Sequence, residues 1–389
     1  MNTPSIALRQ IICLAAVLLL SGAGMRAQEP PKTPAPKASG SSALERISKE
    51  GERAREEHRV DDAIALYKKG IALKPNWDEG WWYVGSLYYD LDQYEAARDA
   101  FRHLTNIAPN TAIGWGMLGL CEFQTRQYNA SLTHIRQAVE LGVSADQTIS
   151  DVIHYHFALL LTRYEHYEDA MKALSAFAQR NLNQPDYVEA MGLAALRKPL
   201  LPSELPPTER EVVMDVGRTL YDATALKTNE AALEFKILLE KYPSEPNIHY
   251  LYGSFLMYSD ANEGLAELKK ELEISPVHVP ALVTIAAEYV HRQDFKPGLP
   301  YAEKAVSIDP QSFAAHAVLG RVLTEGDIDL PRGLKELEYA RQLAPASPQV
   351  RIALATAYTK AGRKDDAARE RQEFLRLRKI TDANEATFQ

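Results

Sequence analysis

Cysteine is scarce in this chain, which has only Cys13 and Cys121 among its 389 residues. The CxxC and HExxH spacings that hold zinc are absent, and so are GxSxG and a glycine-rich phosphate loop. If an N-terminal leader carrying Cys13 is removed, Cys121 can form no internal disulfide, and we expect it to be a buried structural thiol. These absences predict a non-catalytic protein with no cofactor and no metal.

Histidine pairs give no better support for a metal site. His154 and His156 are two residues apart, so they would point to different sides of a helix. Glu288 and His291 are three residues apart and could share a helix face. That pair supplies two ligands, whereas a stable site needs roughly three or four. We therefore expect a solvated surface pair.

Long hydrophobic runs are also missing. The apolar segment at residues 11–20 has roughly half of the ~20 residues that span a bilayer. Arg9 precedes it, small residues follow at 21–24, and no acidic residue occurs before Glu29. This layout is typical of a secretory signal peptide over residues 1–27, cleaved after Ala23 or Ala27. It predicts export to the periplasm or the extracellular space, with an uncleaved anchor as the alternative.

An excess of basic charge is lacking as well. The chain has 44 Lys and Arg against 52 Asp and Glu, and loss of Arg9 and Arg26 with the leader leaves 42 against 52, a net charge of −10. This acidic balance argues against nucleic acid or anionic lipid as the main partner. Residues 28–43, which follow the leader, are rich in proline and serine and predict a disordered linker.

A repeat is the strongest positive signal, in a sequence without the long valine and isoleucine alternation of strands. Gly51, Gly85 and Gly119 are 34 residues apart, and Pro75 and Pro109 keep the same spacing. Further prolines, at 243, 276, 310 and 345, step by 33, 34 and 35 residues. Because several residue types keep phase together, we infer stacked copies of one helical unit.

One copy of this unit, residues 78–111, resembles the tetratricopeptide repeat family. In the family's order it carries Trp81, Val84, Gly85, Tyr88, Ala97, Phe101 and Pro109. Each copy in this family is a pair of antiparallel helices, and stacked pairs imply an all-α, right-handed α-solenoid with a concave inner face. We count nine copies, at residues 44–77, 78–111, 112–145, 151–184, 212–245, 246–278, 279–312, 313–347 and 348–381.

The repeat pattern fails between residues 185 and 211. Residues 185–197 look like a first helix with its own Gly192, but no partner helix follows directly. Residues 198–211 contain four prolines instead, which remove amide donors and clash with a preceding helical turn. We therefore predict an N-terminal stack with a half repeat at 44–197, a connector at 198–211, a C-terminal stack at 212–381 and a tail at 382–389.

The resemblance implies that a ligand contacts the inner face of the first helices. Trp82 and Tyr89 are seven residues apart and therefore share a helix face. Aromatic side chains on such a wall suit an extended peptide or sugar rings, unless they pack between repeats. The inner-face residues carried over by register are Trp82, Tyr89, Leu120, Phe123, Tyr155, Leu159, Arg163, Val216, Leu220, Tyr250, Met257, Tyr258 and His291.

Two functions stay open at this point. The first is a non-catalytic scaffold, exported to the cell envelope, that binds a protein or peptide on its concave face. The second is a subunit of the machinery that exports or assembles envelope polysaccharide or lipoprotein, with a groove that contacts a glycan or a transporter. The family's clamp for chaperone C-termini is not matched, because Ser48 and Glu52 occupy the corresponding first-repeat positions.

Overall fold

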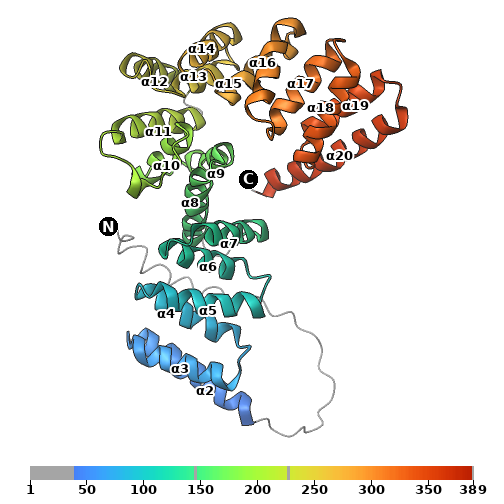
Figure 1. The fold of residues 1–389 in the computed structure, drawn as a ribbon. Coiled ribbons are helices and arrows are strands. Elements are labelled where there is room, and N and C mark those ends of the chain that lie inside the picture. The colour runs from blue at the N-terminus through green and yellow to red at the C-terminus, as the bar shows by residue number, and fades with distance from the viewer. Residues whose placement is uncertain (1–38, 144–146, 226–227, 388–389) are drawn as a thin grey trace. The chain divides into compact units, whose positions relative to one another are not determined.

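The computed structural model describes residues 39–143, 147–225 and 228–387. These residues form nineteen α helices, α2 to α20, and one short 3-10 helix, with no strand among them (Figure 1). The predicted all-α solenoid is confirmed. None of the described helices is long and apolar enough to cross a membrane. The predicted signal peptide and most of the predicted linker lie outside the described residues.

The chain divides into two compact units, residues 1–228 and 229–389. In unit 1, the described helices pack as five consecutive pairs (Figure 1). The pairs are α2 (Ser39–Glu56) with α3 (Val60–Leu73), α4 (Asp78–Asp90) with α5 (Tyr94–Ile107), α6 (Ala112–Gln124) with α7 (Tyr128–Leu141), α8 (Gln147–Arg163) with α9 (Tyr167–Gln179), and α10 (Pro185–Ala195) with α11 (Arg210–Thr224). The 3-10 helix η1 (Pro202–Glu204) lies between α10 and α11.

Unit 2 has the same organisation. Helix α12 (Thr228–Lys241) opens it and packs its buried Phe235 against Tyr252 and Phe255 of the next helix. Four pairs follow (Figure 1). They are α13 (Ile248–Leu256) with α14 (Ala261–Ile274), α15 (Val279–His291) with α16 (Phe295–Ile308), α17 (Phe313–Glu325) with α18 (Leu330–Leu343), and α19 (Pro348–Lys360) with α20 (Lys364–Thr387).

Small residues on one helix receive large side chains from its partner. A Cβ atom at Gly85 would lie 2.8 Å from the ring of Phe101, so only glycine leaves room for this buried ring. At the corresponding place in the next pair, the Ser131 hydroxyl donates to the Gly119 carbonyl at 2.7 Å. The 34-residue phase thus records positions where two helices touch, and the hydrophobic core follows the pairs from α2 to α8.

A side-chain hydrogen bond closes the turn between successive repeats in unit 1. The indole N–H of Trp81 donates to the Pro75 carbonyl at 2.8 Å, and that of Trp115 donates to the Pro109 carbonyl at 2.7 Å. Carbonyls near the end of a helix lack partners within the helix. Each tryptophan therefore satisfies a carbonyl of the preceding turn and fixes one repeat to the next.

The pairing of α10 differs from the sequence-based expectation. We predicted residues 185–197 as a half repeat without a partner and residues 212–245 as one repeat. In the structure, α10 packs against α11 so closely that a Cβ at Gly192 would lie 1.9 Å from the Val213 carbonyl oxygen. A Cβ at Gly217 would lie 2.0 Å from the Val188 carbonyl oxygen. The proline-rich residues 198–211 therefore join the two helices of one pair, and the boundary between units follows residue 228.

Candidate functional site

Several predicted groove residues are buried inside the helix pairs. Trp82 is 9% exposed, Tyr89 is 6% exposed and Leu120 is 1% exposed. The Trp82 ring meets Phe101 of α5 edge-on, with 5.7 Å between ring centroids. The expectation that these residues line an open wall is therefore wrong, because the partner helix covers this face of the first helix. Burial also removes other members of the set from an open surface, namely Leu159, Val216 and Leu220.

The predicted residues of unit 2 form no wall either. Tyr250 is half-buried, and its ring lies against His278 with 4.7 Å between centroids. Tyr258 is 97% exposed at the turn that follows α13. A ring with so little contact area is not held in one orientation. Met257 is half-buried beside it, whereas His291 is exposed at the end of α15.

The remaining predicted residues, Phe123, Tyr155 and Arg163, are half-buried in unit 1. His156 joins the two aromatic residues, because its ring lies 4.6 Å from Phe123 and 5.4 Å from Tyr155 between centroids. Tyr128 extends the row, with its ring edge-on to Phe123 at 5.4 Å. These four half-buried rings, contributed by α6, α7 and α8, form what we call the aromatic strip.

An open groove adjoins one end of this strip. Its volume is about 700 Å³, and it is lined by residues 126–130, residues 163–165 and Pro199. These segments are the turn between α6 and α7 with the start of α7, the end of α8 with the turn after it, and the start of the connector. We call it the Arg163 groove. Arg163 is the one predicted site residue that lines it.

Arg163 is held from two sides. Its guanidinium lies over the Tyr128 ring, 4.6 Å from the centroid, and its Nη1 atom lies 2.5 Å from Glu204 Oε2. A cation over an aromatic face and a charge-assisted hydrogen bond both fix the orientation of the group. Arg126, on the opposite segment, is exposed and has no ion-pair partner among the described residues. The groove therefore contains one oriented guanidinium and one uncommitted one.

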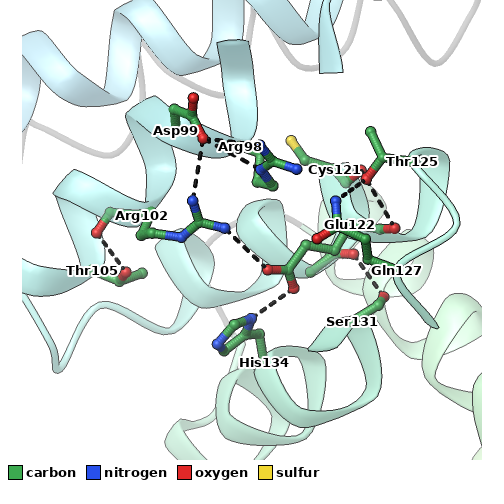
Figure 2. Close-up of polar contacts among 11 residues, drawn as sticks. Arg98, Asp99, Arg102, Thr105, Cys121, Glu122, Thr125, Gln127, Ser131 and His134 are labelled. Carbon is green, nitrogen blue, oxygen red and sulfur yellow. Dashed lines mark hydrogen bonds and ion pairs between the residues drawn. The ribbon is translucent and has the colours of Figure 1, made fainter. Parts of the chain in front are cut away.

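The turn that presents Arg126 and Tyr128 is fixed from beneath by a buried polar network. Figure 2 shows the buried Glu122 carboxylate between His134, whose Nδ1 lies at 2.6 Å, and Arg102 of the preceding pair, at 3.8 Å. A buried carboxylate is stable only with such partners. Together these bonds tie the last turn of α6 to α5 and α7.

Local hydrogen bonds then shape the turn itself. The Thr125 hydroxyl donates to the Cys121 carbonyl at 3.0 Å, and Gln127 Nε2 donates to that hydroxyl at 2.9 Å (Figure 2). Arg126 takes the left-handed conformation, with φ of 60°, and its amide donates to the Phe123 carbonyl at 3.0 Å. The side chain at this position is thereby directed by a well-defined backbone.

Burial keeps the groups next to the groove uncharged. It raises the pKa of the Tyr155 phenol and lowers the pKa of the His156 imidazole, although a hydrogen bond to the Val152 carbonyl opposes the latter shift. Burial also raises the pKa of the Cys121 thiol, which is fully buried as expected for a structural cysteine. Charge at this site therefore comes from the arginines and from exposed carboxylates.

The described part of the chain has no group of three or more His, Cys, Asp or Glu side chains placed to hold a metal ion. The pair considered from the sequence illustrates why. His291 Nδ1 lies 3.7 Å from Glu288, whose carboxylate also accepts a 2.6 Å hydrogen bond from Arg292. The Glu288 side chain is 13% exposed, whereas that of His291 is 83% exposed, so the two residues do not form an open pair of ligands.

Sequence reasoning missed the groove residues Arg126, Tyr128 and Tyr164, together with Glu204 of the connector. The first three lie in or beside turns between paired helices, and the search followed only the inner face of the first helices. The sequence did contain a signal for these residues. Arginine and tyrosine occur together at the turn of one pair, as Arg126 and Tyr128, and again at the turn of the next pair, as Arg163 and Tyr164. Glu204 had no such signal, since it belongs to no repeat.

Residues 48–110 match the model of the tetratricopeptide repeat family. No curated protein matches the chain. Among solved structures, MamA from Desulfovibrio magneticus RS-1, in a form beginning at residue 41, is 20% identical over 43% of this chain and 96% of that one, with a TM-score of 0.39. A crystal structure of MamA is 15% identical over 42% of this chain and 96% of that one, with a TM-score of 0.37.

The family match, the 34-residue phase and the nine pairs among the described helices agree with one another. The match to the tetratricopeptide repeat family covers residues 48–110, and the other described helices continue the same pattern of packed pairs.

Proposed function

We propose that this chain is a non-catalytic scaffold that binds a protein partner through the Arg163 groove. The observation that carries the proposal is the groove itself, an open cleft of about 700 Å³ with arginine, tyrosine and asparagine side chains along it. Arginine and tyrosine are among the residues that are enriched at the energetically dominant positions of protein interfaces. An open polar cleft also suits an extended segment of a partner better than a small molecule, which needs an enclosed apolar pocket.

The rigidity of the site supports the same function. The turn that presents Arg126 and Tyr128 is held by the Glu122 network, and Arg163 is oriented by Tyr128 and Glu204. A partner that docks on side chains already ordered loses less conformational entropy on binding. The aromatic strip adds stiff apolar area beside the groove.

The proposed partner belongs to the cell envelope, because residues 1–27 have the layout of a secretory signal peptide. N-terminal sequencing of the protein recovered from outside the cytoplasm should begin at Gly24 or Gln28. Recovery of a membrane-bound form that retains Met1 would reject export with cleavage. This result is independent of the groove, so it tests location alone.

Affinity capture with the full-length chain as bait tests the groove. An Arg126→Gln, Tyr164→Ala double variant removes one cation that has no ion-pair partner among the described residues and one ring that is 38% exposed, so it should fold like the parent. We expect this bait to lose the partners that the parent chain captures from envelope extracts. The matched control is Tyr258→Ala, which removes an exposed tyrosine from unit 2 and should leave capture unchanged. Equal capture by the double variant and the parent would reject the groove as the binding surface.

A further inference from the structure

Arg163, which lines the groove, already holds a carboxylate from the chain's own connector. Glu204 reaches Arg163 from 41 residues further along the chain. We propose that the partner segment is acidic and that its carboxylate replaces Glu204 on Arg163, so that the connector acts as an internal competitor for the groove. The inference rests on the proposed function and adds to it the chemical class of the partner and a residue that limits its affinity.

Arg163 is prepared for a carboxylate. The Tyr128 ring lies against the guanidinium plane, 4.6 Å away, and leaves the N–H edges of the guanidinium for hydrogen bonding. These edges match the two oxygens of a carboxylate in geometry and charge. The 2.5 Å contact with Glu204 demonstrates that a carboxylate reaches this position. A lysine could not be oriented by the ring in the same way.

Glu204 can leave Arg163 without disturbing the connector. The same oxygen, Oε2, also accepts a 2.9 Å hydrogen bond from the Leu201 amide, and Glu204 keeps this bond when its contact with Arg163 opens. Leu201 and Leu205 are buried on either side and fix the backbone of this segment. The contact can open at the surface, because the Arg163 and Glu204 side chains are 28% and 37% exposed. Exchange therefore breaks one partly exposed ion pair, which is a weak interaction.

The charges around the groove favour an acidic occupant. Arg126 and Arg163 provide two positive charges in the lining, whereas Glu165 is its one acidic residue. A neutral or basic segment would leave Arg163 without a carboxylate after displacing Glu204. An acidic segment replaces the lost ion pair and gains the attraction of Arg126. The groove thus distinguishes partners by charge.

Binding of fluorescein-labelled hexaglutamate to the full-length chain tests this inference, with hexaglutamine as the neutral probe. Glu204→Gln should bind hexaglutamate about two- to fivefold more tightly than the parent, because the internal competitor is neutral. Arg163→Gln should bind it about fivefold more weakly or worse. Hexaglutamine should bind weakly to every variant. The control Glu303→Gln breaks a similar ion pair in unit 2, where Arg332 lies 2.7 Å from Glu303, and should match the parent.

The outcomes separate this inference from the proposed function. Unchanged or weaker hexaglutamate binding by Glu204→Gln, in a chain that melts like the parent, overturns the internal competitor. Hexaglutamate binding that does not depend on Arg163 overturns the acidic partner. If trigalacturonate binds through Arg163 and hexaglutamate does not bind, the ligand of the groove is an acidic glycan. This result also overturns the inference of an acidic partner segment. Partner capture that depends on Arg126 and Tyr164 but not on Glu204 would retain the scaffold and reject the competitor.

Discussion

The two units are built from the same helix pairs but stabilise them differently. In unit 2, side chains at the N-termini of five helices accept hydrogen bonds from free backbone amides, at Asp260, His278, Ser312, Asp329 and Ser347. In unit 1, no such bond occurs at the eight α helices whose preceding residue is described. Unit 1 instead contains all four tryptophans of the chain, at 77, 81, 82 and 115. Its repeats are therefore held together mainly by large side chains.

This contrast links stability to the location of the candidate site. Local caps stabilise five helices of unit 2 individually, whereas the aromatic side chains of unit 1 join neighbouring helices. The same kind of residue provides the aromatic strip and the ring beneath Arg163. Because all tryptophans lie in unit 1, the unfolding of the two units can be measured separately. Tryptophan fluorescence reports on unit 1 alone, while far-ultraviolet circular dichroism reports on both units.

The largest expected effect comes from removing buried rings in unit 1. Trp82→Ala and Tyr89→Ala should each lower the free energy of unfolding of unit 1 by about 3–5 kcal/mol, because they open cavities in its core. Tyr89→Ala keeps every tryptophan, so its fluorescence transition should occur at lower denaturant while the dichroism retains a later transition from unit 2. Tyr258→Ala should melt like the parent. A Tyr89→Ala protein with normal stability would mean that this ring lines a groove after all.

A second large effect tests where unit 1 ends. Gly217→Ala should lower the free energy of unfolding by about 2–3 kcal/mol, because the new methyl would lie 2.0 Å from the Val188 carbonyl oxygen, a backbone atom that cannot turn away. The control is Gly114→Ala, where the nearest atom is the end of the Leu104 side chain at 3.3 Å. Hydrogen exchange over α10 and α11 should report the loss. Equal stability of the two variants would contradict the pairing of α10 with α11.

The sequence predicted the fold well because the repeat records contacts between helices. Gly85 and Phe101 keep their spacing since one must admit the other, so the phase alone indicates the pair. The same pattern failed for α10, because its partner begins only after the connector and the fixed distance to the second helix is lost. A glycine such as Gly217 indicates a close approach but not which helix approaches.

The candidate site was less predictable from the sequence. Helical spacing placed Trp82 and Tyr89 on one face correctly, but exposure depends on what covers that face, and here α5 does. Arg163 was found because it lies on a first helix, whereas its partner Glu204 is 41 residues away on an irregular segment. Contacts with a segment outside the repeat have no period in the sequence.

A moderate effect distinguishes the units by their helix caps. Asp260→Ala removes an acceptor that lies 3.0 Å from the amides of both Asn262 and Glu263, and should cost unit 2 about 1 kcal/mol. Thr111→Ala at the start of α6 removes no cap bond, so it should lower the free energy of unfolding of unit 1 by only about a few tenths of a kcal/mol. Chemical denaturation followed by dichroism and by fluorescence assigns each change to its unit. Equal losses would remove the contrast in capping.

The smallest expected effect is a difference in acid sensitivity. In unit 1, burial lowers the pKa of His156 below its ordinary value of 6.5. As the pH falls, the unfolded chain therefore binds a proton at His156 before the folded chain does. The contribution of this residue to stability is complete above pH 6.5 and is lost as the pH falls through the lowered pKa. In unit 2, burial tends to raise the pKa of Glu267, but hydrogen bonds from Lys270 and His249 lower it overall, below the ordinary 4.5. That contribution is lost only below pH 4.5.

Mild acidification should therefore loosen α8 before α14. Hydrogen exchange at pH 7 and at steps below 6.5, corrected for the intrinsic rate, should show protection falling first in α8, while α14 keeps its protection until the pH passes below 4.5. Glu189 in unit 1 has a pKa raised by burial, which favours folding as the pH approaches 4.5, so the His156 effect is clearest at the upper end of this range. His156→Phe keeps a ring against Phe123 and should abolish the early loss. Early loss that persists in His156→Phe, or that begins in α14, would show that this imidazole does not set the difference between the units.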